Sequence, residues 1–126
     1  MLVKRILVID NDELIQEAVQ TILQMTTEWQ VLTESSGSEG LMKVESEKPD
    51  VILLDLIMPD MDGISTFQAI QANSAIQMIP VILLTGKAES SELSYYQTLG
   101  LKGAIAKPFE MFNLATQIAQ IMGWDF

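Results

Sequence analysis

Charged, amide and hydroxyl side chains follow four short apolar runs of this sequence. They are Asp10 with its neighbours Asn11 and Asp12, Asp55, Thr85, and Lys107. Grouped carboxylates can hold a divalent cation, and an ammonium beside them can bind an anion. An acid such as Asp55, which comes after four apolar residues, is costly unless it is paired or binds a metal. These residue types indicate a site for charged groups, provided that the fold brings them together.

Two alternating apolar patterns predict the elements that position these side chains. Runs typical of strands occur at Arg5–Ile9, Gln30–Thr33, Val51–Leu54, Val81–Leu84 and Gly103–Ala106. Helical spacing occurs at Glu13–Met25, Ser38–Glu47, Gly63–Ala72, Ser90–Leu99 and Glu110–Met122. Five strand–helix repeats predict an α/β fold, a doubly wound parallel sheet with helices on both faces. Ligands bind such sheets beyond the carboxyl ends of the strands, where the polar residues above stand.

The first and last predicted helices have the clearest apolar stripes. On the first helix the stripe consists of Leu14, Ile15, Ala18, Val19, Ile22 and Leu23. On the last helix it consists of Phe112, Ala115, Ile118, Ala119 and Met122. We expect both stripes to face the core.

The composition excludes several classes of function. The chain has no cysteine and no histidine, which removes disulfides, thiolate nucleophiles, the usual zinc sites and every histidine-dependent triad. Its formal net charge of −10 opposes direct binding to nucleic acid and to anionic membranes. No apolar stretch approaches the roughly 20 residues of a membrane span, and a signal-peptide layout is missing, so a cytoplasmic protein is expected.

Each candidate residue also has an ordinary structural explanation. Asp10 or Asp12 could cap the helix that begins near Glu13, and for Asp12 the two explanations are equally supported. Thr85 alone could be a plain strand residue. Lys107 alone could be a surface lysine, although Lys-Pro-Phe directly after a buried strand is a specific arrangement.

Four stretches together resemble the receiver domain of two-component response regulators. They are ILVID (6–10), DVILLDLIMPDMDG (50–63), PVILLTG (80–86) and AKPF (106–109). The resemblance covers the whole chain in the order of the family. It implies a flavodoxin-like fold with five helices and the strand order 2-1-3-4-5. It also implies one receiver domain over residues 1–126, of the stand-alone type without an output domain.

The resemblance implies that Asp55 is the phosphoacceptor. Its carboxylate would take a phosphoryl group from the phosphohistidine of a sensor histidine kinase or a histidine phosphotransfer protein. The reaction would require Mg²⁺, with Asp10, Asn11, Asp55 and the backbone carbonyl of Ile57 as protein ligands. The domain would signal to a downstream protein target, and it would catalyse only its own phosphorylation and dephosphorylation.

The remaining site residues have supporting roles by the same resemblance. Lys107 would bind the phosphoryl oxygens and Thr85 would donate its hydroxyl to them. Pro59 and Gly63 would shape the loop after Asp55, and the Lys107–Pro108 bond would be cis. The face made by the fourth helix, fifth strand and fifth helix, with Leu101, Lys102 and Ala104, would be the output face.

Two residues depart from the family pattern. The metal-binding pair is normally two acids, whereas Asn11 brings an oxygen without charge, so weaker metal binding is expected. Asp12, at the position where the family usually has a third, more exposed acid, could swing in to compensate. At the switch position the family has Phe or Tyr, but this chain has Ala104. The signal would then travel through backbone shifts or through Tyr95 and Tyr96, which are otherwise ordinary helix-surface and core residues.

Two other classes of function compete with a phosphoacceptor. A pseudo-receiver would keep the fold and bind proteins without phosphate, which Asn11 and Ala104 favour. The retention of Asp10, Asp55, Thr85 and Lys107 opposes it. An enzyme on the same architecture would need a glycine-rich phosphate loop after the first strand, and the chain has Asn-Asp-Glu there. A phosphohydrolase with a DxD nucleophile is also disfavoured, because Leu and Ile follow Asp55.

Overall fold

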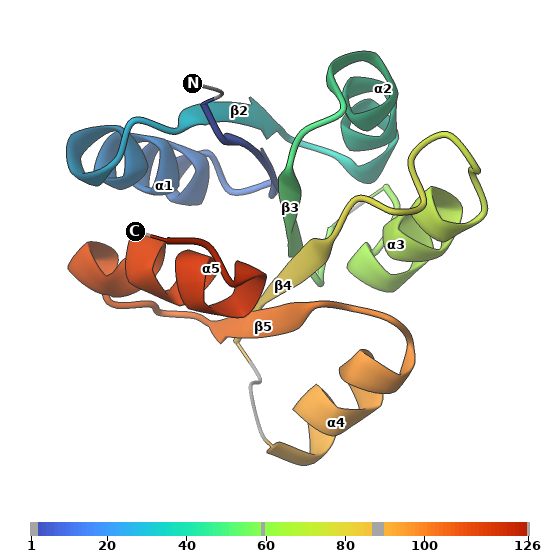
Figure 1. Cartoon of the computed structure of the whole chain (residues 1–126). Coiled ribbons are helices and arrows are strands. Elements are labelled where there is room, and N and C mark those ends of the chain that lie inside the picture. Colours follow the sequence, from blue (N-terminus) through green and yellow to red (C-terminus); the bar gives the residue numbers. More distant parts are fainter. Residues whose placement is uncertain (1–2, 59, 87–89, 126) are drawn as a thin grey trace.

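Five parallel strands form one sheet in the computed structural model, which describes residues 3–58, 60–86 and 90–125, with residues 90–93 described by their backbone alone (Figure 1). The strands are β1 (Arg5–Ile9), β2 (Gln30–Glu34), β3 (Val51–Asp55), β4 (Val81–Thr85) and β5 (Gly103–Ala106). Their order is β2-β1-β3-β4-β5, with every neighbouring pair parallel. The predicted fold class and strand order are therefore confirmed.

Helices cover both faces of this sheet. They are α1 (Glu13–Thr26), α2 (Gly37–Glu47), α3 (Gly63–Gln71), α4 (Ser90–Thr98) and α5 (Leu114–Met122). Figure 1 shows α1 and α5 on one side of the strands and α2 and α3 on the other. Among the described residues, no helix is both long and apolar enough to cross a membrane.

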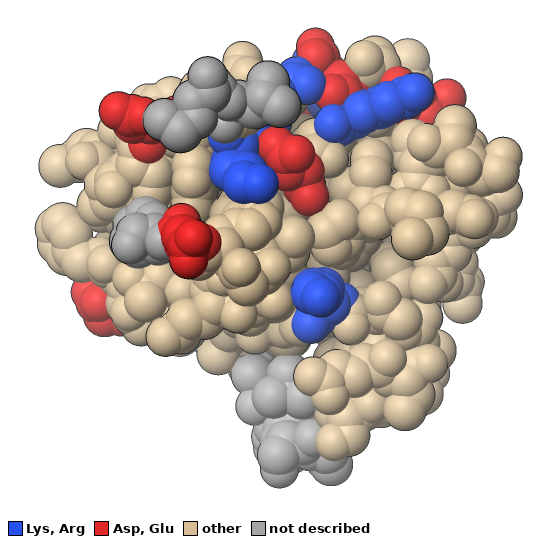
Figure 2. All heavy atoms as spheres, viewed as in Figure 1, with Lys and Arg blue, Asp and Glu red and all other residues tan. Residues whose placement is uncertain are grey.

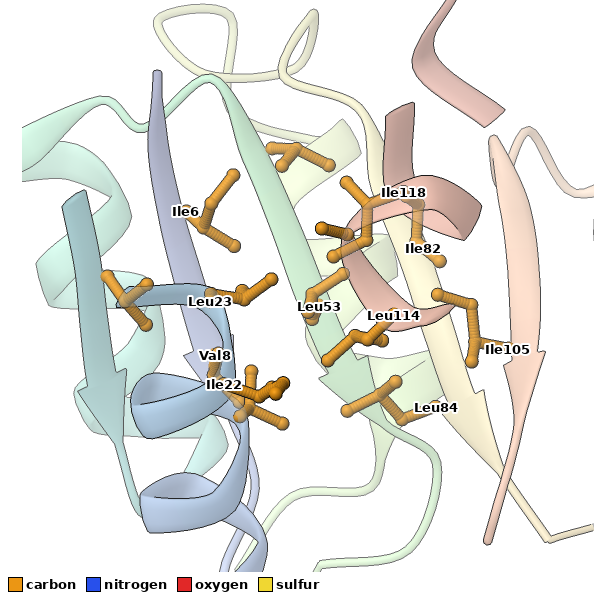
Figure 3. Packing of buried hydrophobic residues seen from close by; sticks show 14 residues of the cluster. Ile6, Val8, Ile22, Leu23, Leu53, Ile82, Leu84, Ile105, Leu114 and Ile118 are labelled. Carbon is orange, nitrogen blue, oxygen red and sulfur yellow. The ribbon is translucent and has the colours of Figure 1, made fainter. Parts of the chain in front are cut away.

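The alternation of side chains along each strand divides the core between the two faces. Ile6 and Val8 of β1 belong to the cluster under α1 and α5, which Figure 3 shows around Leu53 and Leu84. Leu7 and Ile9 belong to the opposite cluster, with residues of α2 and α3. All residues of β3 and β4 are buried, as expected of central strands covered on both faces. Burying each such Leu or Ile contributes about 1.5–3 kcal/mol, so the central strands are a stiff support for the residues at their ends.

The start of α5 is the main correction to the predicted elements. A 3₁₀ helix, η1 (Met111–Asn113), precedes α5, so the α-helix begins at Leu114 and not at Glu110. The Glu110 carboxylate accepts a hydrogen bond from the Phe112 amide at 3.3 Å, which favours this separate turn. In the tighter 3₁₀ turn Phe112 does not share the α-helical stripe, and it is 72% exposed. All other element bounds agree with the predicted ones to within one residue.

Leu14 is a second correction, because it is 75% exposed and not part of the core. It lies in the first turn of α1, directly after the Asp12 cap. This turn adjoins the carboxyl end of β1, where the strand no longer provides a surface to pack against. The buried residues of α1 are Val19, Ile22 and Leu23, beyond its first turn.

Candidate functional site

Lys107 brings the ends of three strands together. Its Nζ atom lies 2.7 Å from Oδ2 of Asp10 and 3.3 Å from Oδ1 of Asp55. Asp10 follows β1, Asp55 ends β3 and Lys107 follows β5. The two oxygens that share the ammonium are therefore at most 6.0 Å apart, the sum of 2.7 Å and 3.3 Å. The expected convergence at the carboxyl edge of the sheet is present for these three side chains.

Asp10 is fully buried, and each of its carboxylate oxygens has a partner. Oδ2 accepts from Lys107, and Oδ1 accepts from the Asp12 amide at 2.9 Å. Gln16 donates its side-chain amide to the Asp10 carbonyl and also to Oγ of Ser35 at 3.0 Å. A fully buried acid paired with an ammonium is an arrangement built for charge, not for packing.

The sequence left two roles open for Asp12, capping of the first helix and a part in the site, and the structure shows the capping role. Its Oδ1 accepts from the Leu14 amide at 2.9 Å, and Asp12 is the N-cap of α1. Its carboxylate therefore satisfies an amide of the first helical turn, a contact that typically contributes about 1 kcal/mol.

The pKa values of Asp55 and Lys107 are both raised, for different reasons. Burial raises the pKa of the Asp55 carboxyl, the charge of Asp10 raises it further, and Lys107 offsets part of the shift. For Lys107, burial opposes the charged form. Its hydrogen bond to Asp10 and the charges of Asp10 and Asp55 outweigh burial, so the pKa of Lys107 lies above its usual 10.5. The ammonium thus stays protonated between the two acids.

The backbones of Thr85 and Gly63 lie close to this cluster. Thr85 is buried at the end of β4, and its carbonyl accepts from the Lys107 amide at 2.7 Å. The Gly63 amide donates to the Leu56 carbonyl at 2.8 Å. A Cβ atom at position 63 would overlap the Asp55 carbonyl and lie 2.8 Å from Cα of Leu56, so only glycine fits there.

The other predicted site residues lie around the edge. Asn11 and Ile57 are exposed, and the Ile57 amide lies 3.4 Å from Oδ1 of Asp55. The Lys107–Pro108 bond is cis, as expected. Pro59 lies outside the described residues.

The switch position, Ala104, lies within β5, three residues before Lys107. Ala104 packs against the core cluster under α2 and α3 and lines a pocket with Tyr96, Leu101 and Ile121. Tyr96 packs partly against the same cluster, whereas Tyr95 is 59% exposed. The two tyrosines are therefore the core and surface residues that the sequence indicated.

The donor set fits a hard divalent cation with a reduced number of charged ligands. Within the described residues no group of three or more acids, histidines or cysteines converges on one point. Asp10 and Asp55 provide carboxylate oxygens on either side of the Lys107 ammonium, and Asn11 and the Ile57 carbonyl are neutral oxygen donors nearby in the chain. Oxygen ligands of this kind suit Mg²⁺.

Sequence reasoning missed two polar residues that join the site, or the loop after Asp55, to neighbouring elements. Gln16 binds the Asp10 carbonyl from α1, and Asp60 binds the start of α2. Both contacts join separate elements, and a hydrophobic period along one segment carries no signal for them.

Comparisons with known proteins agree on one family. The family model described as the response regulator receiver domain matches residues 6–119. The alkaline phosphatase synthesis transcriptional regulatory protein PhoP of Bacillus subtilis is 34% identical over 122 residues, which cover 94% of this chain and 48% of PhoP. The transcriptional regulatory protein CseB of Streptomyces coelicolor is 29% identical over 93% of this chain and 48% of CseB.

Solved structures show the same likeness. The chemotaxis response regulator CheY4 of Vibrio cholerae superposes with a TM-score of 0.87 at 26% identity, over 95% of this chain and 99% of CheY4. This chain spans about half the length of the curated relatives named above. The chain belongs to the response regulator receiver domains, the signalling domains of two-component systems.

Proposed function

We propose that this domain is a phosphoacceptor and that Asp55 takes the phosphoryl group. The observation that carries the proposal is the Lys107 ammonium, held at 2.7 Å from Asp10 and 3.3 Å from Asp55. An unpaired acid at this depth would be costly, and a cation placed between two carboxylates is the arrangement that an incoming phosphoryl group needs.

The residues divide the transfer between them. An Oδ atom of Asp55 attacks the phosphorus of a phosphohistidine, the P–N bond breaks, and the histidine nitrogen keeps the bonding electron pair. Asp10, Asn11, Asp55 and the Ile57 carbonyl would hold Mg²⁺, which supplies positive charge against the transferring oxygens. Lys107 then turns from the carboxylates to a phosphoryl oxygen, and the Thr85 hydroxyl donates to another.

The partners follow from this chemistry. The donor is a sensor histidine kinase or a histidine phosphotransfer protein, and the output is a protein target. A surface with little charge supports the second point. From Ser94 to Ala106 the only charged residue is Lys102, and 111–122 carries none, in a chain of net charge −10. Figure 2 shows a largely uncharged surface over α4 and β5 on the viewed face.

A pseudo-receiver that works without phosphate has less support. Asn11 and Ala104 favour it, but a drifted pocket has no reason to keep a fully buried Asp10 paired with Lys107. Neutral Asn11 is compatible with phosphorylation because an amide oxygen could ligate Mg²⁺ without bringing a charge.

One experiment tests the proposal. The protein is incubated with Mg²⁺ and acetyl phosphate, and intact mass is measured for the wild type and for Asp55→Ala. We expect the mass of one phosphoryl group on the wild type and none on the variant. Beryllofluoride, a stable phosphoryl mimic, provides a second readout by NMR. A wild type that shows neither modification nor a beryllofluoride response at saturating Mg²⁺ would overturn the proposal.

A further inference from the structure

Two contacts hold the loop that carries Ile57: one is with the core, and the other is at the end of the loop. It runs from Asp55 to Gly63, and Pro59 is outside the described residues. The Gly63 amide closes it onto the Leu56 carbonyl at 2.8 Å. The Met58 side chain is 7% exposed and lies in the core cluster under α2 and α3. Neither contact involves the exposed part of the loop around Asp60.

Asp60 fastens that exposed part to the start of α2. Its Oδ1 accepts from the Gly37 amide at 3.3 Å, and its Oδ2 accepts from the Ser38 amide at 3.2 Å and the Ser38 hydroxyl at 2.7 Å. Residues 22 positions apart are thereby joined by one carboxylate. The position suits a negative charge, because the amides at a helix N-terminus carry partial positive charge.

The packing around these bonds is close. A Cβ atom at Gly37 would overlap the Thr66 hydroxyl and lie 3.0 Å from Cβ of Met61. Glycine at this position therefore lets the first turn of α2 approach the loop residue next to Asp60. The hydroxyl of Ser38 also keeps the pKa of Asp60 below its usual value, so the carboxylate remains charged when it accepts these bonds.

Capping of α2 does not explain Asp60. Ser36 is already the N-cap of this helix, since its side chain accepts from the Glu39 amide at 3.1 Å and its hydroxyl lies 3.2 Å from a Glu39 carboxylate oxygen. Both bonds are made within residues 36–39, so the helix end has a side-chain cap without Asp60. The bonds of Asp60 instead connect the helix to the loop between Asp55 and Gly63.

We propose that Asp60 is a positioning residue for the metal-binding loop. By joining the loop to the first turn of α2, it limits movement of the segment after Met58 and so helps to keep the Ile57 carbonyl where it would ligate the cation. The proposal rests on the proposed function for the metal, but the fastening itself does not. Partners outside the ligand shell that fix a ligand typically contribute 10- to 100-fold to metal affinity.

The test compares Asp60→Ala with Ser36→Ala, a control that weakens the same helix end without touching the loop. Two quantities are measured for each variant: the Mg²⁺ dissociation constant by calorimetry, and the hydrogen-exchange rates of the Ile57 and Gly63 amides by NMR without metal. We expect Asp60→Ala to raise the dissociation constant about tenfold and to speed exchange at both amides. Asp60→Asn, which keeps one acceptor oxygen, should lie between Asp60→Ala and the wild type. Ser36→Ala should lower the melting temperature and leave both quantities unchanged.

The outcomes separate the two proposals. Unchanged loop exchange in Asp60→Ala would show that Asp60 does not fasten the loop. Faster exchange with unchanged Mg²⁺ affinity, or equal losses of affinity in Asp60→Ala and Ser36→Ala, would also overturn the positioning role. A wild type that binds no Mg²⁺ would overturn the proposed metal site and with it the positioning of a ligand, whereas the exchange rates would still report the fastening.

Discussion

Replacing Lys107 with methionine tests how charge is balanced between Asp10 and Asp55. Methionine keeps a long, unbranched side chain and removes the ammonium. We expect Lys107→Met to lower the free energy of unfolding in the absence of metal, because two carboxylates then share a buried site without a counter-charge. The exposed Lys102→Met is the matched control, and its expected change is below about 0.5 kcal/mol.

The distances set the size of the effect. With an effective dielectric constant of about 20, the ammonium attracts Asp10 at 2.7 Å by about 6 kcal/mol and Asp55 at 3.3 Å by about 5 kcal/mol. The two oxygens, at most 6.0 Å apart by the sum of those distances, repel by at least about 3 kcal/mol. Desolvation of the ammonium offsets much of the attraction, and Asp55 can take up a proton once Lys107 is gone. The expected loss is therefore about 3 kcal/mol, the lower end for breaking a buried ion pair.

Urea unfolding followed by circular dichroism, with EDTA and with saturating Mg²⁺, measures the loss in both states. A ligand that binds only the folded protein stabilises it according to its concentration and affinity. Since no ammonium competes for the carboxylates in Lys107→Met, Mg²⁺ should stabilise the variant more than the wild type and shrink the loss. An equal loss in EDTA and in Mg²⁺ would refute the view that metal and ammonium share these oxygens.

Three further predictions address single residues. Asn11→Asp should tighten Mg²⁺ binding about tenfold by adding a charged ligand, and an unchanged dissociation constant in calorimetry would contradict the charge argument. Asp55→Asn should be more stable than the wild type at pH 7 in EDTA. The raised pKa of Asp55 means that its ionised form costs stability above that pKa, and the cost disappears as the pH falls towards the usual 3.8. The difference between variant and wild type should therefore shrink on acidification in urea titrations, and a difference that grows would show that the sign is wrong. Gly63→Ala should lose about 1–3 kcal/mol in urea unfolding, because its Cβ would overlap the Asp55 carbonyl; a loss under about 0.5 kcal/mol would mean that the loop yields easily.

The strands and the main charged cluster could be predicted because their signals are local. Runs such as VILLD and VILLT are apolar up to their last residue, and a short β-branched run of this kind is typical of a strand covered on both faces. Once the strands are parallel, their carboxyl ends share one edge. The meeting of Asp10, Asp55 and Lys107 then follows from the fold class, before any distance is known.

The errors arose where a local pattern has two structural solutions or where no local pattern exists. Phe112 fits a helical stripe by spacing, but the Glu110 carboxylate stabilises a separate 3₁₀ turn that leaves the ring exposed. Leu14 has the right spacing too, yet it lies at the end of the helix that the sheet does not cover. The bonds from Asp60 to Gly37 and Ser38 depend on how two loops meet in space.

The two tryptophans lie at the end of the sheet away from the charged cluster. Trp29 precedes the first residue of β2, and its ring packs edge-on against Trp124 after α5, with centroids 5.4 Å apart. Lys4, just before β1, places its ammonium 4.7 Å from the Trp124 ring centroid. We therefore expect tryptophan fluorescence to change when the amino edge of the sheet unfolds. We expect no change in fluorescence when an ion binds at the opposite edge. A fluorophore that detects ion binding has to be introduced near the charged cluster. The two native tryptophans then serve as an internal reference for folding.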